Sequence, residues 1–240
     1  MKRLFFYITA ATVLIACKKD ENTQPKQLLY TQNYSINWNM DDDISVISGS
    51  IGSSENDYKY LSSDDKSVIS INGLKFTPPK YPDYHNRVGT SFLGLVGADF
   101  ILYKSDGSMV KNKVNASEVR YADFAPDFPT IIPKSKVLNI EWVGQLPIDN
   151  GEKLSVSILG ARTQNDSTGW QPTARVLIEG VYNSNKVEIP QSELAKLPEG
   201  DAIVNIGRGG GFKQLAIKDN DIPSYVSFSS IATRKVKIVN

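Results

Sequence analysis

Apolar and polar residues alternate along much of the second half of the chain. Leu138, Ile140 and Trp142 are separated by single residues, and the same period of two recurs at 154–158, 202–206, 226–228 and 236–238. A half-buried antiparallel strand requires this period, because successive side chains point to opposite faces of a sheet. The pattern therefore predicts an all-β protein in which Trp142 belongs to a core.

Turn-forming residues lie between these segments. The pairs at 106–107 (Asp-Gly) and 150–151 (Asn-Gly) are typical of tight hairpins, and 183–185 (Asn-Ser-Asn) predicts another. Only 191–197 has a helical pattern, and it is one or two turns long. Many short strands separated by Gly, Asn and Pro turns indicate β-sandwiches.

A cluster of prolines at 126, 129 and 133 predicts a domain boundary, because proline interrupts strand ladders and helices. Each side of this cluster has about the length of one immunoglobulin-like sandwich, roughly 100 residues. We therefore expect two tandem immunoglobulin-like β-sandwich domains, at residues 29–133 and 134–240. A single continuous domain is the alternative.

The N-terminus has the features of a lipoprotein signal peptide. Met1-Lys2-Arg3 is basic, residues 4–16 are apolar apart from two threonines, and the only cysteine, Cys17, follows directly. The apolar run is shorter than the roughly 20 residues that a membrane-spanning helix needs. Leu14-Ile15-Ala16-Cys17 resembles the lipobox of bacterial lipoproteins, which implies cleavage after residue 16 and a lipid on Cys17. An uncleaved anchor or an ordinary secretory signal is the alternative.

The residues after the cysteine carry a second signal. Lys19, Asp20 and Glu21 resemble the lysine-then-acid export tag of Bacteroidota surface lipoproteins, from which Asn22 departs. The resemblance implies display on the outer face of the outer membrane. A solvated polar tether without export function is the alternative, because the stretch 17–28 is too polar to pack against a core.

Charge and cysteine content exclude several function classes. The formal charge is +1, and removing 1–16 takes away Lys2 and Arg3, which leaves −1. A nearly neutral chain has no basic surface for nucleic acid or for anionic lipid. The expected contact with the membrane is the lipid on Cys17, which the lipobox resemblance implies. Once Cys17 is lipidated, no thiol remains for a disulfide or a cysteine-ligated metal.

Candidate catalytic groups are few. His85 is the only histidine, it lies in a turn-rich segment, and the chain has no Gly-x-Ser-x-Gly motif to accompany it. Paired carboxylates can hydrolyse glycosides, but a sequence does not show their separation. We therefore predict a protein without catalytic residues or cofactors, with a carboxylate-based glycoside hydrolase as a less favoured reading.

Two further motifs are interpreted as structural. The acidic runs 41–43, 64–65 and 219–221 are expected to be solvated turns, with calcium binding as the alternative and no metal site predicted. The glycine-rich segment 207–212 lacks the Gly-Lys-Ser/Thr and the helix of a phosphate-binding loop. It predicts a hairpin tip or a bulged loop between two strands.

Aromatic residues among turn formers are the best binding candidates. Tyr81, Tyr84 and Trp170 lie outside the alternating segments. An exposed aromatic ring can stack on the C–H face of a sugar or anchor a protein partner. These three residues are therefore the predicted ligand-binding residues.

The second half of the chain combines a Trp-bearing strand at 138–143, the phrases 189–194 (Ile-Pro-Gln-Ser-Glu-Leu) and 197–200 (Leu-Pro-Glu-Gly), and a strand ending at Arg208. It resembles Bacteroidota surface lipoproteins with a C-terminal immunoglobulin/fibronectin-like β-sandwich. The resemblance implies a fold, with the short helix crossing between sheets, rather than an activity. Together these features predict a non-catalytic binding or adhesion module with glycans as the leading ligand class. A structural or protein-interaction subunit of an envelope assembly is the alternative.

Overall fold

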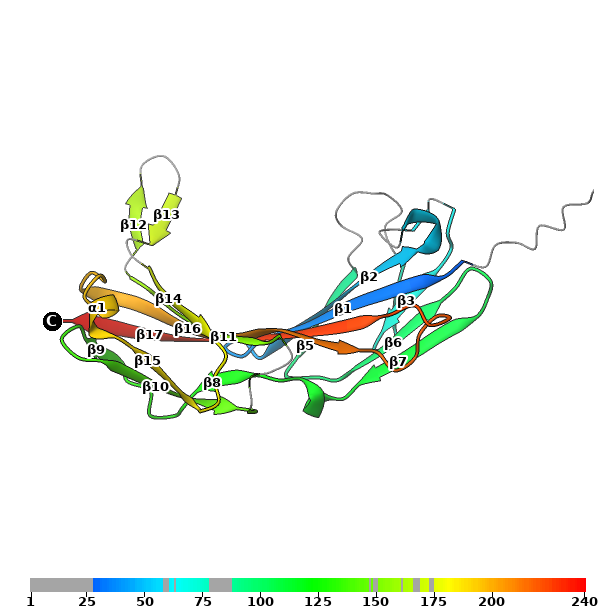
Figure 1. Ribbon diagram of the computed structural model, residues 1–240. Helices are drawn as coiled ribbons and strands as arrows, with labels where there is room; N and C mark the ends of the chain where they lie inside the picture. The colour runs from blue at the N-terminus through cyan, green and yellow to red at the C-terminus, as the bar shows by residue number, and fades with distance from the viewer. Residues whose placement is uncertain are drawn as a thin grey trace, which may run out of the picture.

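The computed structural model describes residues 28–57, 61–62, 64–77, 88–146, 148, 151–160, 162–165, 169–172 and 175–240. Nearly all regular structure within these ranges is β-strand, which confirms the predicted all-β class. The molecule is elongated, with two packed lobes lying end to end (Figure 1). We call the lobe containing β1–β7 the first lobe and the lobe containing β8–β15 the second lobe. No helix in the described ranges has the length and apolar character needed to cross a membrane.

One sheet of eight strands, here called the central sheet, runs through both lobes. In spatial order its strands are β14 (Arg175–Gly180), β11 (Lys153–Leu159), β16 (Gly200–Gln214), β17 (Tyr225–Val239), β1 (Tyr30–Asn39), β2 (Ile44–Ser53) and β5 (Val88–Leu93), with β9 (Ile131–Pro133) joined to β17 off this path.

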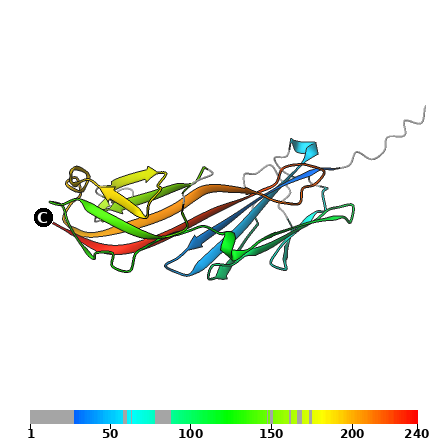
Figure 2. The same cartoon turned by 60° about the horizontal axis from the view of Figure 1, so that its bottom comes forward.

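The strands β16 and β17 form the spine shared by the two lobes (Figure 2). Each is 15 residues long, and they pair antiparallel along their length. On its other side, β17 pairs in parallel first with β1 and then, near its end, with β9. At about 3.3 Å per residue, each strand covers roughly 50 Å, which is long enough to contribute to two cores.

Two smaller sheets cover one face of the central sheet. Over the first lobe lie β4 (Leu74–Phe76), β3 (Val68–Ile71), β6 (Ala98–Tyr103) and β7 (Met109–Val114). Over the second lobe lie β15 (Lys186–Ile189), β10 (Leu138–Gly144) and β8 (Ala122–Phe124). The remaining elements are the hairpin β12 (Arg162–Asn165) and β13 (Gly169–Pro172), the 3-10 turns η1 (Ser54–Asn56) and η2 (Ala116–Glu118), and the helix α1 (Gln191–Leu194).

The helix α1 connects β15 of a covering sheet to β16 of the central sheet. This is the crossing that the sequence resemblance implies, and it places the helix within the predicted segment 191–197. Leu194 is fully buried in the second core, so the short helix closes one end of that lobe.

Each lobe has its own hydrophobic core between the central sheet and its covering sheet. The first core contains Tyr34, Phe100 and Leu102, whereas the second contains Trp142, which is buried as predicted. The cores do not divide at the predicted boundary of 133/134. Ala122, Phe124 and Ile132 belong to the second core, and Leu215, Val226 and Phe228 belong to the first. Two sandwiched cores therefore share one continuous sheet.

The predicted turns differ in outcome. The pair 106–107 joins β6 to β7 in an antiparallel hairpin, as expected, with φ of 85° at Gly107. The hairpins predicted at 150–151 and 183–185 are wrong, because β10 and β11, and likewise β14 and β15, belong to different sheets. Gly151, with φ of 80°, and Asn185, whose side chain donates to the Trp142 carbonyl at 3.0 Å, instead redirect the chain between sheets.

Candidate functional site

The middle of the outer face of the central sheet, which points away from both cores, carries many small uncharged polar side chains, with the exposed Val46 and Ile231 among them. The strand registers bring them together from six strands, although they are far apart in sequence. We call the following set the polar face: Asn33, Ser35, Asn37, Asn39, Ser48, Ser50, Ser91, Ser155, Ser157, Asn205, Ser227, Ser229 and Thr233.

Hydroxyl and amide groups on this face bond to one another both within a strand and across neighbouring strands. The Oγ atoms of Ser35 and Ser48 lie 2.6 Å apart, and Asn37 Nδ2 donates to Ser35 Oγ at 3.2 Å. The Ser229 hydroxyl also bonds to the Asn37 side chain. These hydrogen bonds hold the side chains in place. Because a hydroxyl has two lone pairs and a rotatable proton, it can still form a further hydrogen bond with a ligand.

The same arrangement continues into the second lobe. Thr233 Oγ1 donates to Asn205 Oδ1 at 3.0 Å, and Asn205 Nδ2 donates to Ser157 Oγ at 3.3 Å. The polar face therefore extends along β16 and β17 across the junction of the lobes.

A depression of about 360 Å³ lies on the first-lobe part of this face. Gly49 is required in its floor, because a Cβ there would stand 2.7 Å from the ring carbons of Tyr34. Tyr34 in turn stacks on Phe100 of the covering sheet, with ring centroids 3.9 Å apart. The depression is lined by Asn33, Tyr34, Ser35, Asn37, Ser48, Gly49, Ser50 and Ser227.

Two aromatic side chains border the polar face at its first-lobe end. Phe212 of β16 is 66% exposed and lies opposite Ser227, and Tyr225 of β17 is 39% exposed and lies opposite Asn33. Exposed rings beside hydroxyls and amides are the combination that binds sugars, since the ring stacks on C–H groups and the polar groups bond to hydroxyls.

A β-bulge points Phe212 toward solvent. The β16–β17 register shifts between Arg208 and Gly211, which adds one residue on β16. Before the bulge the even-numbered residues of β16 face the core, whereas after it Gly211 is buried and Phe212 is exposed. An extra residue reverses the alternation of side chains, so the bulge places an aromatic ring on the polar face.

Two glycines and a buried ion pair surround this bulge. Gly210 has φ of 86°, and a Cβ on Gly211 would stand 2.7 Å from Glu152 Cγ. Glu152 Oε2 accepts from Arg208 Nη2 at 2.6 Å, and the two side chains are 4% and 1% exposed. Arg120 Nη1 approaches the same carboxylate oxygen at 3.2 Å. The ion pair therefore lies directly beneath the segment that presents Phe212.

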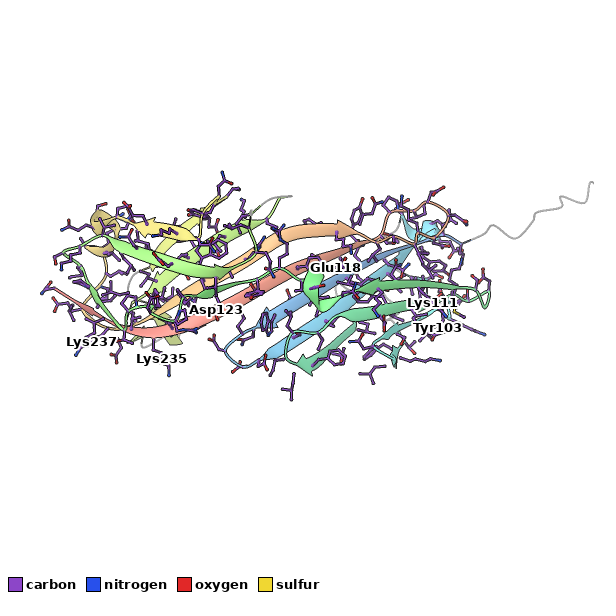
Figure 3. The ribbon with its side chains drawn as sticks, turned by 90° about the horizontal axis from the view of Figure 1, so that it is seen from below. Tyr103, Lys111, Glu118, Asp123, Lys235 and Lys237 are labelled. Carbon is purple, nitrogen blue, oxygen red and sulfur yellow. The ribbon has the colours of Figure 1, made fainter. Side chains whose placement is uncertain are left out.

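The reversal after the bulge also turns Lys213 toward the covering segment, where it bonds to Glu118 of η2. Glu118 lies at the junction of the lobes (Figure 3). The hydrogen bond from Lys213 and the backbone N–H of Asn115 hold the pKa of Glu118 below its ordinary value.

The far end of the outer face is charged. Lys235 and Lys237 extend from β17 (Figure 3), where their strand partners are Ile203 and Asp201. They border a depression of about 680 Å³ that includes Leu159 at the end of β11. The β12–β13 hairpin follows β11 and projects on the side opposite β9, β10 and β15 (Figure 1).

Of the predicted binding residues, the structure places the backbone of Trp170 in β13, paired with Gln164. Tyr81 and Tyr84 lie outside the described residues, as do His85, Cys17 and the predicted export signal Lys19, Asp20 and Glu21. The aromatic residues that the structure brings to the polar face, Phe212 and Tyr225, were not predicted. The only local signal for Phe212 in the sequence is its position directly after a run of glycines.

The glycine-rich segment 207–212 lies within β16, so the prediction of a hairpin tip or a loop joining two strands is wrong. The predicted bulge is present, but it interrupts a single long strand. Gly211 lets the Glu152 side chain lie close to the backbone of β16, and the chain does not reverse its direction there.

In two of the acidic runs, one aspartate is buried while its neighbours are exposed in a turn, so these runs are only partly solvated. Asp65 accepts from the Tyr30 hydroxyl at 2.8 Å, and Asp219 accepts from Lys104 Nζ at 2.9 Å. Both aspartates are buried, so they stabilise the end of the first lobe instead of facing water. Asp41 is more exposed and accepts from the backbone of Thr233. Within the described residues, no three His, Cys, Asp or Glu side chains are grouped to hold a metal ion.

A scan against models of protein families and a search of curated proteins found no match to this chain.

Proposed function

We propose that this protein is a non-catalytic binding module that holds neutral, hydroxyl-rich glycans on the polar face of its central sheet. The observation that carries the proposal is the row of uncharged hydroxyl and amide groups bordered by the exposed rings of Phe212 and Tyr225. Ser, Thr and Asn side chains do not ionise near neutral pH, which suits hydrogen bonding to a neutral ligand rather than acid–base hydrolysis. They also cost less to desolvate than charged side chains do.

Glycan-array binding by the purified protein tests this proposal. Phe212→Ala and Tyr225→Ala each remove an exposed ring without opening a core, so both variants should fold normally. Losing one stacking contact worth about 1.4 kcal/mol weakens binding about tenfold. Leu74→Ala, on the covering sheet and 49% exposed, is the matched control and should leave binding unchanged. Trp170→Ala tests the contact predicted from the sequence.

Two results would contradict the proposal. One is that no glycan binds the wild-type protein at any concentration reached. The other is that binding survives both Phe212→Ala and Tyr225→Ala at full strength, which would move the site away from the polar face.

The same proposal places the protein on the outer face of the outer membrane, anchored by a lipid on Cys17. Support comes from the basic, apolar and cysteine sequence at the N-terminus and from Lys19-Asp20-Glu21. Cys17→Ala should abolish metabolic labelling with palmitate. Replacing Lys19, Asp20 and Glu21 by alanine should protect the protein from protease added to intact cells, while leaving the lipid label in place.

A protein-interaction role in an envelope assembly is the second candidate. The observation that favours it is the exposed apolar residue Leu93, 80% exposed, on the edge strand β5 beside Ile44 of β2. Such apolar side chains at a sheet edge are typical of partner-binding surfaces. A stoichiometric partner that co-purifies with the wild-type chain but not with Leu93→Asp would support this function over glycan binding.

A further inference from the structure

The strand β14 ends the central sheet in the second lobe. It pairs residue by residue with β11 on one side, and no strand of the described part of the chain pairs with its other side. The open side of such a strand presents backbone N–H and C=O groups to any further strand.

The side chains of β14 are arranged symmetrically about Leu177. Arg175, Leu177 and Glu179 are exposed, whereas Val176 is buried and Ile178 is half-buried on the opposite face. Arg175 and Glu179 carry opposite charges, and each is two residues from Leu177. An antiparallel pair of identical strands centred on Leu177 therefore places Arg175 of one copy opposite Glu179 of the other, twice.

The second face is complementary in the same register. Val176 of one copy lies opposite Ile178 of the other. On the exposed face, between the charged pairs, the two Leu177 side chains meet at the two-fold axis. Opposite charges and apolar pairs directly across antiparallel strands each stabilise the pairing by roughly 0.2–1 kcal/mol. An interface to which both copies contribute the same patch has two-fold symmetry, and such an interface closes into a dimer.

The edge strands β7 and β5 do not have this property. The edge strand β7 exposes Lys111 and Lys113, so a symmetric pair centred between them at residue 112 would place lysines opposite lysines. Lys111 lies on this edge in Figure 3. The edge strand β5, with the sequence Val-Gly-Thr-Ser-Phe-Leu, has no charge with which to select a register.

We propose that two copies of this chain associate through β14, which pairs antiparallel with itself in the register that sets Arg175 against Glu179. The central sheet then continues from one copy into the other, with both outer faces on the same side. A pair of six-residue strands buries less than the roughly 1,200 Å² of a standard stable interface. The dimer is therefore weak and depends on concentration.

If the proposed function holds, the dimer presents two polar faces to one extended glycan, and the second contact forms at a high effective concentration. The dimerisation proposal does not depend on this consequence. It is tested by association alone, so failure of glycan binding leaves it standing.

Sedimentation velocity of the purified full chain at increasing concentration tests the proposal, with Cys17→Ala in every sample to exclude a disulfide. The wild-type sequence should shift from monomer to dimer as the concentration rises. Arg175→Glu and Glu179→Arg each create two like-charge pairs and should weaken dimerisation about tenfold or more, equivalent to about 1.4 kcal/mol.

Two combinations distinguish this register from any other charge effect. The double variant R175E/E179R restores both opposite-charge pairs, so it should dimerise like the wild type. An equimolar mixture of the two single variants should form a heterodimer, since one copy supplies two acids and the other two bases. Both residues are exposed, so circular dichroism and thermal unfolding should match the wild type.

A wild-type chain that stays monomeric at every concentration would overturn the proposal. Single variants that dimerise as well as the wild type would also overturn it, as would a double variant that fails to regain dimerisation.

Discussion

Replacing Glu152 by alanine should destabilise the protein strongly, because it removes the carboxylate that pairs with a buried arginine. Arg208 Nη2 lies 2.6 Å from Glu152 Oε2, and the side chains are 1% and 4% exposed. Removing one partner of a buried ion pair typically costs about 3–5 kcal/mol, because the other charge remains out of water. Arg208 keeps contacts to the carbonyl oxygens of Tyr121 and Gln145, so the lower end, about 3 kcal/mol, is expected.

Urea unfolding followed by tryptophan fluorescence measures this loss directly. For a chain of this length, about 3 kcal/mol corresponds to a fall in Tm of roughly 6–12 °C. Glu141→Gln is the control, because Glu141 pairs with Lys186 at 2.7 Å and both side chains are more than half exposed. Exposed pairs contribute little to stability, so this control should unfold like the wild type.

A double variant separates the cost of the unpaired charge from the loss of packing. Replacing the pair by apolar residues in Arg208→Met/Glu152→Leu should be less destabilising than Glu152→Ala alone, because the buried charge of Arg208 is removed together with its carboxylate. A loss below about 1 kcal/mol for Glu152→Ala would refute the view that this pair stabilises the bulge region.

Three further predictions address the bulge, its neighbouring ion pair and the second core. Gly211→Ala should cost about 1–3 kcal/mol in urea unfolding, because its Cβ would stand 2.7 Å from the buried Glu152; an unchanged midpoint would contradict this. Lys213 lowers the pKa of Glu118 from 4.5, so this pair stabilises the fold above that pH and loses its effect as the pH falls through the lowered pKa. The Tm of Glu118→Gln should therefore fall less steeply with acidification than that of the wild type; parallel curves would count against the pair. Trp142→Ala should cost about 3–5 kcal/mol by differential scanning calorimetry, since the indole is 1% exposed in the second core; a loss typical of a surface site would contradict this.

Strand positions and core residues could be predicted because both depend on local alternation. Trp142 lies in β10 and is buried, and the alternating segments at 154–158 and 202–206 lie in β11 and β16. The period of two is a property of the extended backbone itself, so a half-buried strand carries it whatever its neighbours are.

Strand partners could not be predicted, because alternation does not say which apolar faces meet. The turn at 150–151 looks like a hairpin turn, yet β10 and β11 pack in opposite layers of the second lobe. The buried aspartates show the same limit. Asp219 bonds to Lys104, which is 115 positions away, and no local pattern distinguishes such an aspartate from one in a solvated turn.

The candidate site depends most strongly on tertiary structure. Its serines and asparagines are the ordinary polar positions of six separate strands, and they form one face only because the registers align them. Phe212 joins them because a bulge reverses the alternation after Arg208. The amino-acid sequence by itself determined that strands form and which of their faces is apolar, since side-chain alternation acts within each strand. The order of the strands, the shared 15-residue spine and the polar face were decided only by packing, because they depend on contacts between segments far apart in the chain.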